Sequence, residues 1–296
     1  MKPIRERWLS LLIPSNELTA DGIEKSNETY QEYLKGASVP KQTSDLIHKD
    51  IERTKIVSIT GISSNYLDKV RDQEKVRVVI ERILTVFAYT NKSIGYVQGM
   101  NVICAIIYYV MSYNEQPYSE SLCYFCFFNL MVDIGDYFTE KMDNAETGIF
   151  GQQRAILEIL KQKDSLLYTH IAKKNLFKNS AFHIRWMILL FSAEFELKDT
   201  LILWERFFHE SPKRKMIPYF CAASLVTLRE IIINDDEMKT LGSLEVVRIN
   251  PYNALAIAEE FLKAIPYSTL FHSSANPHLN KPSRKASRAP HNKIAQ

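Results

Sequence analysis

The sequence predicts an all-α fold, and three observations carry this prediction. Apolar residues recur at intervals of three and four over most of the chain, which is the spacing of one face of an α-helix. Glycine is scarce, with 9 among 296 residues, which suits helices better than a fold with many tight β-turns. Strand-like alternation never continues for more than a few residues, and residues 56–60 are the one short strand candidate.

The helical period can be followed along the chain. Apolar residues recur on one face from about Glu74 to Tyr89 and predict an amphipathic helix there. Asn101 is expected to cap a very apolar helix over residues 102–113. Further helical patterns cover residues 119–132, 151–163, 165–174, 180–195, 199–208 and 218–233.

The last predicted helix has clear start and stop signals. Asn250-Pro251 combines a capping residue with proline at the first helical position, and Pro266 ends the pattern. Beyond it, residues 273–296 contain Pro, Ser, Asn and Lys without an apolar period. We therefore predict a disordered, basic tail over these residues.

The length of the chain exceeds that of a typical single domain, so one large or two smaller domains are expected. A boundary near residues 175–180 would divide the helices into two lobes. These lobes would cover residues 1–177 and 178–272, and both motifs described below would lie in the first.

Net charge is +3, and it is unevenly distributed. Residues 276–296 hold five basic residues and no acid, which leaves 32 basic and 34 acidic residues elsewhere. The near-neutral body argues against a nucleic-acid-binding protein. The tail predicts at most a weak peripheral contact with anionic lipid. The longest apolar run, residues 102–111, is too short to span a bilayer, and the N-terminus lacks a signal-peptide core, so a cytoplasmic location is expected.

Four cysteines lie in apolar surroundings, and Cys123-x-x-Cys126 has the spacing of a zinc or redox pair. A zinc site needs four ligands, and no second pair of Cys or His has a matching spacing. On a helix, two cysteines three positions apart among phenylalanines are more simply core residues. We therefore predict core packing for the cysteines and no metal site.

Two short strings, residues 47–54 and 96–101, carry the main functional signal. The first contains the guanidinium of Arg53, and the second contains the carboxamide of Gln98 beside Gly99. A fixed cation neutralises charge on a transferring phosphoryl group, and a fixed amide orients the attacking water. Together they suit the acceleration of phosphoanhydride hydrolysis in a nucleotide that another protein holds.

Each string also has a simpler interpretation. Arg53 lies three positions after Asp50 on an expected helix, so the two side chains would form a surface ion pair. Ile47 and Ile51 would face the core one turn apart. Gln98 would be a loop residue that satisfies backbone groups.

Taken together, the strings Ile-x-x-Asp-x-x-Arg-Thr and Tyr-x-Gln-Gly resemble the paired fingerprint of the TBC domain family, whose members are GTPase-activating proteins for Rab GTPases. One departure concerns Lys55, because family members often carry proline shortly after Arg-Thr. Weaker similarities to the family lie at residues 5–12, 136–138, 186–191 and 203–208.

The resemblance implies a two-lobed helical TBC-type domain over residues 1–272. Its partner would be a Rab-family small GTPase in the GTP state, and its setting would be vesicle trafficking in the cytoplasm, with peripheral contact with endomembranes. Arg53 would reach the phosphates, and Gln98 would act in trans in place of the amide of the GTPase. The supporting residues would be Asp50, Thr54, Tyr96 and Gly99.

No cofactor of its own is expected, since GTP and Mg²⁺ would be held by the partner. The chain lacks the Gly-x-x-x-x-Gly-Lys-Ser/Thr loop that binds nucleotide phosphates, so it would be a catalytic activator rather than a hydrolase with its own nucleotide site. The alternative is a non-catalytic helical module that binds a GTPase or an adaptor. Residues 284–287 also resemble a basophilic kinase site at Ser287.

Overall fold

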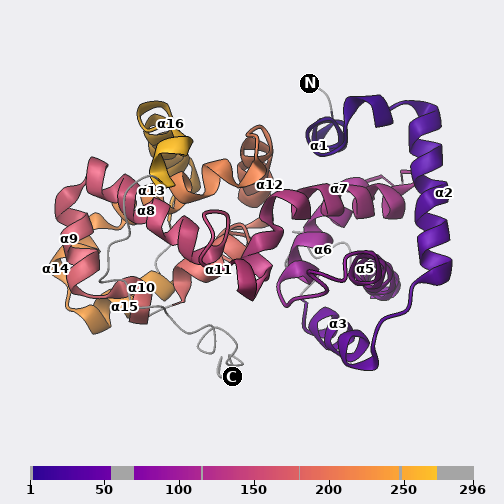
Figure 1. Ribbon diagram of the computed structural model, residues 1–296, viewed down its shortest axis with the longest axis horizontal. Coiled ribbons are helices and arrows are strands. Elements are labelled where there is room, and N and C mark those ends of the chain that lie inside the picture. Colours follow the sequence, from indigo (N-terminus) through magenta and orange to yellow (C-terminus); the bar gives the residue numbers. More distant parts are fainter. Residues whose placement is uncertain (1–2, 55–69, 115, 180, 247–248, 272–296) are drawn as a thin grey trace. The chain divides into compact units, whose positions relative to one another are not determined.

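The computed structural model describes residues 3–54, 70–114, 116–179, 181–246 and 249–271. Within these ranges the regular elements are α-helices and 3₁₀-helices without a strand (Figure 1), which confirms the predicted all-α fold. The strand candidate at residues 56–60 and the tail predicted to be disordered, residues 273–296, lie outside the described residues.

The chain forms two compact units. The first comprises Met1–Thr139 and Phe195–Lys213, and the second comprises Glu140–Glu194 and Arg214–Gln296. This division differs from the boundary near residues 175–180 that we predicted. Both functional strings nevertheless belong to one unit, the first.

The first unit contains seven α-helices within its described residues, and short 3₁₀-helices at Ser15–Glu17 and Gly135–Phe138. The α-helices are α1 (Ile4–Leu12), α2 (Ala20–Gly36), α3 (Lys41–Arg53), α5 (Val70–Thr90), α6 (Met100–Met111), α7 (Ser119–Ile134) and α12 (Leu197–Phe208).

Helix α6 occupies the interior of the first unit. Its sequence is apolar on all sides, which is the pattern of a helix enclosed by other elements. It contacts α1, α3, α5 and α7 (Figure 1), and Ile103, Cys104 and Ile107 have no exposed surface. Met100 and Asn101 at the start of α6 are buried as well, so this end of the helix is held by the surrounding elements.

Helix α12 belongs to the first unit, where three side-chain pairs attach it to α1. The Trp8 ring stacks on the Trp204 ring at 6.0 Å and meets the Phe208 ring edge-on at 5.0 Å. At the rim, the Arg7 guanidinium donates two hydrogen bonds to the Glu205 carboxylate, at 2.7 and 2.9 Å. Residues almost 200 positions apart thus form one core, which a boundary placed by position along the chain does not anticipate.

A polar cluster connects three other helices of this unit. The Tyr30 hydroxyl of α2 donates to Glu120 Oε1 of α7 at 2.7 Å, and Arg82 Nε of α5 donates to the same oxygen at 2.9 Å. The carboxylate is charge-balanced by the guanidinium, so these side chains fix α2, α5 and α7 to one another.

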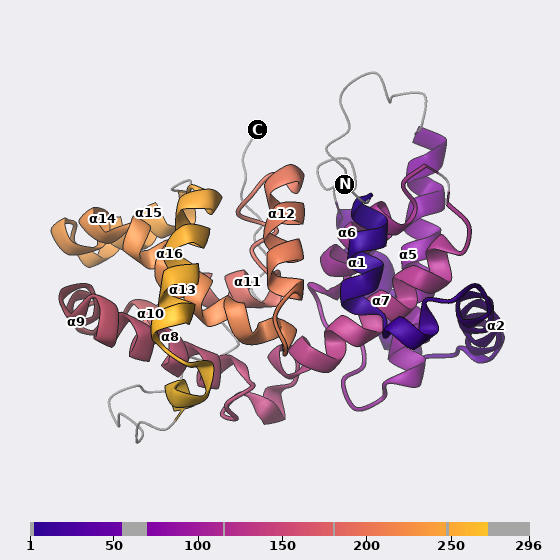
Figure 2. The same cartoon turned by 90° about the horizontal axis from the view of Figure 1, so that it is seen from above.

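In the second unit, α13 is the central helix. It contacts α8, α11 and α16, and Figures 1 and 2 show α16 beside it. Cys221, Ala222 and Ala223 of α13 have no exposed surface. The α-helices of this unit are α8 (Ile149–Lys163), α9 (Ser165–Lys173), α10 (Leu176–Asn179), α11 (Phe182–Ile188), α13 (Ile217–Thr227), α14 (Arg229–Asn234), α15 (Glu237–Val246) and α16 (Pro251–Ala264), and its 3₁₀-helices include Glu140–Met142 and Tyr267–Phe271.

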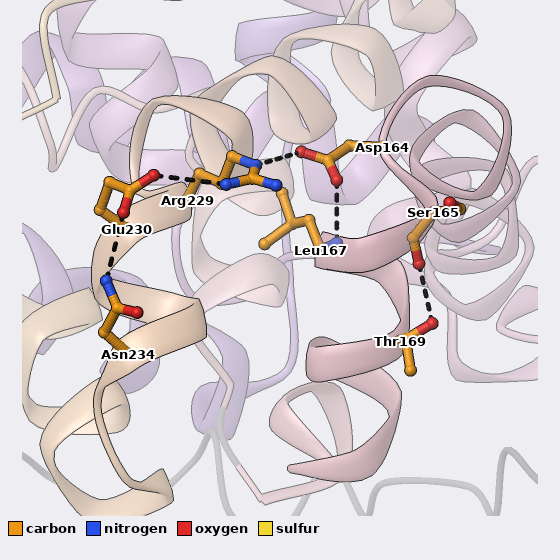
Figure 3. Close-up of polar contacts among 7 residues, drawn as sticks. All are labelled: Asp164, Ser165, Leu167, Thr169, Arg229, Glu230 and Asn234. Atoms are coloured by element: carbon orange, nitrogen blue, oxygen red, sulfur yellow. Dashed lines mark hydrogen bonds and ion pairs between the residues drawn. The ribbon is translucent and has the colours of Figure 1, made fainter.

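One carboxylate joins two helices of the second unit (Figure 3). Asp164 Oδ1 accepts the Leu167 N–H at 2.9 Å and caps the first turn of α9. Its Oδ2 accepts Arg229 Nε of α14 at 2.7 Å. Asp164 therefore satisfies an unpaired helix N–H and at the same time anchors α14 beside α9.

Two predicted helices are shorter than expected. The helix expected over residues 180–195 ends at Ile188, because Leu190 and Phe191 adopt positive φ values of 47° and 63°. The Phe191 N–H donates to the Trp186 carbonyl at 2.9 Å, which closes the helix end as a glycine-type cap does. The helix expected over residues 218–233 is divided at Leu228 into α13 and α14.

Two further predictions are confirmed, the cap of the last helix and the burial of the cysteines. Asn250 caps α16 by accepting the N–H groups of Tyr252 and Asn253 at 3.0 Å. All four cysteines are buried and free, as expected for core residues. Among the described residues, no group of three or more His, Cys, Asp or Glu side chains has the arrangement of a metal site. None of the described helices is both long and apolar enough to cross a membrane.

Candidate functional site

Helix α3 carries the first string, and its two faces differ. Ile47 and Ile51 are 0% and 2% exposed and pack inward one turn apart, as their spacing predicted. Asp50 is also buried, whereas Arg53 is exposed at the last position of the helix. The string thus presents its guanidinium to solvent from a helix whose other face is anchored in the core.

The two strings meet through Asp50 and Tyr96. The Tyr96 hydroxyl donates to Asp50 Oδ2 at 2.9 Å, and both residues are at least nine-tenths buried. Burial raises the pKa of Asp50 above its ordinary value, while the Tyr96 hydrogen bond and the Arg53 charge act in the opposite direction. Burial also raises the pKa of Tyr96, so this hydroxyl stays a proton donor.

The surface ion pair considered for Asp50 and Arg53 is absent, although the structure describes both residues. Asp50 directs its carboxylate inward to the Tyr96 hydroxyl, whereas Arg53 lies on the solvent side. Asp50 therefore supports the end of α3 through the core rather than through the guanidinium. Within the described ranges, the Arg53 guanidinium makes no ion pair or hydrogen bond.

The second string forms a tight turn before α6. Gly95 and Gly99 have φ values of 65° and 104°, in the region that glycine adopts without strain. A Cβ at Gly95 would meet no atom within 4 Å, so the constraint there is the backbone conformation rather than space. Tyr96 is buried beneath the turn and Gln98 is exposed on it.

Asn101 is the residue whose role the sequence did not predict. It was expected to cap the helix that follows it, but α6 begins at Met100, with Gly99 at the capping position. The Asn101 carboxamide instead donates through Nδ2 to Thr54 Oγ1 at 2.7 Å and to the Asp50 carbonyl at 3.3 Å. Its Oδ1 accepts the Gly99 N–H at 3.1 Å. The only sequence signal for this role was the position of the asparagine directly after Gln-Gly-Met. Local capping rules led us to interpret it as a helix cap.

Thr54 completes the contact between the strings. It follows the last residue of α3, and it is only 7% exposed. Its hydroxyl donates to the Asp50 carbonyl at 2.7 Å and accepts from Asn101. The predicted supporting residues Asp50, Thr54, Tyr96 and Gly99 therefore form one hydrogen-bonded cluster together with Asn101.

The cluster gives the site a simple chemistry. Two exposed side chains, one cationic and one amide, belong to two segments whose buried side chains are hydrogen-bonded to each other. Such an arrangement suits the stabilisation of charge on an external phosphoryl group. The other segments that resemble the family are core elements, since Trp8, Tyr137, Trp186 and Trp204 are fully buried.

Comparison with known proteins places this arrangement in a family. A profile of the Rab-GTPase-TBC domain matches residues 5–233, well over half of the chain. Human TBC1 domain family member 13 is 35% identical over 162 residues, which cover 53% of this chain and 40% of the human protein. Human TBC1 domain family member 22B is 25% identical over 266 residues, which cover 81% and 50%. The matches span half or less of the length of these relatives.

Two solved structures share the fold. The crystal structure of the YPT/Rab-GAP domain of Gyp1p matches with a TM-score of 0.73 at 18% identity, covering 90% of this chain and 88% of that chain. The TBC domain of the Chlamydomonas flagellar RabGAP matches with a TM-score of 0.61 at 19% identity, covering 86% and 79%. These likenesses show the fold, and the profile match shows the relationship: this chain belongs to the Rab-GTPase-TBC domain family.

Proposed function

We propose that this chain accelerates GTP hydrolysis by a Rab-family small GTPase in its GTP state. The observation that carries the proposal is the buried joint between α3 and the turn before α6, from which Arg53 and Gln98 project to solvent. Family membership directs the proposal to Rab proteins, since a related solved domain is described as a YPT/Rab-GAP domain. A cytoplasmic setting at endomembranes and a role in vesicle trafficking belong to the same proposal.

The two exposed side chains have separate roles in the proposed reaction. The Arg53 guanidinium offers a planar fork of donors to the phosphate oxygens, where negative charge is redistributed in the transition state. The Gln98 carboxamide orients the attacking water in place of the glutamine of the GTPase. An arginine finger alone accelerates hydrolysis by roughly 10³–10⁵-fold in other GTPases.

The nucleotide and its Mg²⁺ are assigned to the partner in this proposal. The chain has no Gly-x-x-x-x-Gly-Lys-Ser/Thr loop with which to cradle phosphates. Its contribution is therefore to complete a site that is already loaded. This assignment makes the chain a catalytic activator that turns over from one GTPase molecule to the next.

The alternative is a module that binds a GTPase or an adaptor without accelerating hydrolysis. The sequence observation behind it is Lys55, which stands where family members often carry proline and lies outside the described residues. A binding module predicts complex formation with an unchanged rate of hydrolysis. A measurement of the rate of GTP hydrolysis therefore distinguishes the two candidate functions.

The experiment is a screen of GTP-loaded Rab proteins and other small GTPases for phosphate release, with this chain in catalytic amounts. We expect at least one Rab to be accelerated by wild type and not by Arg53→Ala. Arg206→Ala is the matched control, since it removes another arginine of the same unit, which lies on α12 and pairs with Glu210 just after that helix. Binding of a Rab without acceleration would establish the alternative.

A further inference from the structure

We propose that Asn101 is a positioning residue that holds the Arg53 and Gln98 segments in register with each other. Its single carboxamide contacts the end of α3 and the turn before α6 at once. The consequence for rate rests on the proposed function, whereas the joint itself is a property of the free protein. These two parts are tested separately below.

On the α3 side, Asn101 satisfies backbone that the helix cannot satisfy itself. The last four carbonyl groups of a helix lack partners within it. The Asp50 carbonyl is one of these, because the Thr54 N–H donates to Ile51 instead. It accepts the Thr54 hydroxyl and Asn101 Nδ2. Asn101 therefore holds the final turn of α3, which is the turn that carries Arg53.

On the other side, Asn101 holds the turn that carries Gln98. The Gly99 N–H belongs to a left-handed backbone position directly after Gln98, and it donates to Asn101 Oδ1. Asn101 itself lies in the first turn of the enclosed helix α6, so its position is set by the core. Through Asn101, the turn that carries Gln98 is therefore fixed to both α6 and the end of α3.

A carboxamide is the side chain that this place requires. It must donate twice to oxygens of the α3 end and accept once from a backbone N–H, and it is 6% exposed, so water does not substitute. Aspartate retains the acceptor and loses both donors. Alanine loses all three bonds. The two substitutions therefore separate the α3 contact from the Gly99 contact.

The first test measures the joint in the free protein by hydrogen–deuterium exchange. We expect Asn101→Ala to speed exchange in peptides covering both residues 46–54 and 96–101. Asn101→Asp should affect residues 46–54 more than the Gly99 amide. Asn129→Ala is the control, because Asn129 donates one bond to the Leu12 carbonyl of the same unit at 2.8 Å, outside the cluster. If Asn101→Ala leaves either segment unchanged, or if Asn129→Ala gives the same pattern, the proposal is overturned.

The second test measures rate with a responsive GTPase under single-turnover and steady-state conditions. A displacement of catalytic groups by about 1 Å costs about 100-fold, so Asn101→Ala should lower kcat by about that factor, with little change in the KM for the GTPase. Thr54→Val, which preserves shape, should lower kcat less. The double variant should lose less than the sum of the two single losses, because each single variant already removes the bond from Asn101 to Thr54, while Thr54→Val also removes the bond from Thr54 to the Asp50 carbonyl.

The outcomes of the two tests separate the two proposals. Faster exchange in both segments with an unchanged kcat would show a structural joint without a positioning role and would overturn the inference. A kcat loss restricted to Asn101 and Thr54 variants, absent in Asn129→Ala, would support it. If wild type accelerates no GTPase, the proposed function fails, and the exchange data alone then decide whether Asn101 joins the segments.

Discussion

The Tyr96 hydroxyl donates a 2.9 Å hydrogen bond to the Asp50 carboxylate, and neither residue is more than 8% exposed. This bond joins two segments 46 positions apart in the sequence. A buried carboxylate is costly unless hydrogen bonds stabilise its charged form, and burial indeed raises the pKa of Asp50. The segments that carry Arg53 and Gln98 are therefore joined by a buried hydrogen bond between Tyr96 and Asp50.

The first prediction concerns this contact. Tyr96→Phe removes the hydroxyl and leaves the Asp50 carboxylate buried with less support, so the free energy of unfolding should fall by about 1–3 kcal/mol at neutral pH. The free energy lost through Tyr96→Phe should be smaller when Asp50 is first replaced by asparagine, because no buried charge then lacks a hydrogen bond. Urea unfolding of both single variants and the double variant measures the coupling. If the double variant lost the sum of the two single-variant free energies, the predicted coupling between Tyr96 and Asp50 would be contradicted.

The same bond predicts the direction of a pH effect. The pKa of Asp50 is raised in the folded protein, so the folded state binds this proton more readily than the unfolded chain does. Its contribution to stability is present at low pH and is lost as pH rises through the raised pKa. The Tyr96 bond acts against this rise because it stabilises the charged carboxylate. The cost of Tyr96→Phe should therefore be smaller in acid, where Asp50 is protonated, than at neutral pH, which the same unfolding series measures.

The second prediction concerns Arg53. Arg53→Ala should lower kcat for phosphate release by at least about 1000-fold, because the guanidinium acts on charge that develops in the transition state. Arg53→Lys retains the charge without the fork of donors and should also be severely impaired. Arg53 is exposed and makes no ion pair or hydrogen bond with another described residue, so the thermal midpoint should change little. A retained rate above about one-tenth of wild type would refute this role.

The third prediction concerns Gln98. If its amide orients water in trans, a GTPase whose own glutamine is replaced by alanine should still be stimulated by this chain. Gln98→Ala should abolish stimulation with Arg53 still in place. Single-turnover phosphate release for the four combinations of wild type and alanine at the two glutamines is the measurement. Stimulation that follows the glutamine of the GTPase and ignores Gln98 would leave Arg53 acting alone.

The fourth prediction concerns His183 in the second unit. It is fully buried, its Nε2 lies 3.2 Å from Gln153 Oε1, and its Nδ1 has no hydrogen-bond partner among the described residues. Burial lowers its pKa to about 3 from an ordinary value near 6.5. Between these values the unfolded chain binds a proton that the folded protein does not. His183 therefore lowers stability as pH falls below about 6.5, by up to about 1.4 kcal/mol per pH unit.

The matched variant for this prediction is His183→Gln, which keeps a donor toward Gln153 and cannot be protonated in this range. It should be less stable than wild type at pH 7, because the ring packs edge-on against Phe177 at 4.6 Å. The difference in the free energy of unfolding between wild type and His183→Gln should become smaller as pH is lowered from about 6.5 toward 5. Urea midpoints across this range decide the question, with exposed His209→Gln as the control for loss of a histidine. A constant difference would show that His183 does not titrate as described.

The helices that sequence patterns predicted well are those whose ends carry local signals. Asn250-Pro251 predicted the start of α16 because a capping side chain and a proline act within a few residues of one another. The end of α11 was missed for the opposite reason. Leu190 is an unusual residue for a left-handed position, and it is held there because its side chain and that of Phe191 are buried in the second unit.

By itself, the sequence determined the all-α class, the two strings and the inward-facing pair Ile47 and Ile51, because helical period and motif chemistry are local properties. Only the tertiary structure decided that α12 belongs with α1, and that Asn101 joins Thr54 to Gly99 instead of capping its own helix. Those relationships depend on contacts between residues far apart in the chain. Side-chain hydrogen bonds of that kind form when the fold buries polar groups, because a buried polar group without a partner is costly.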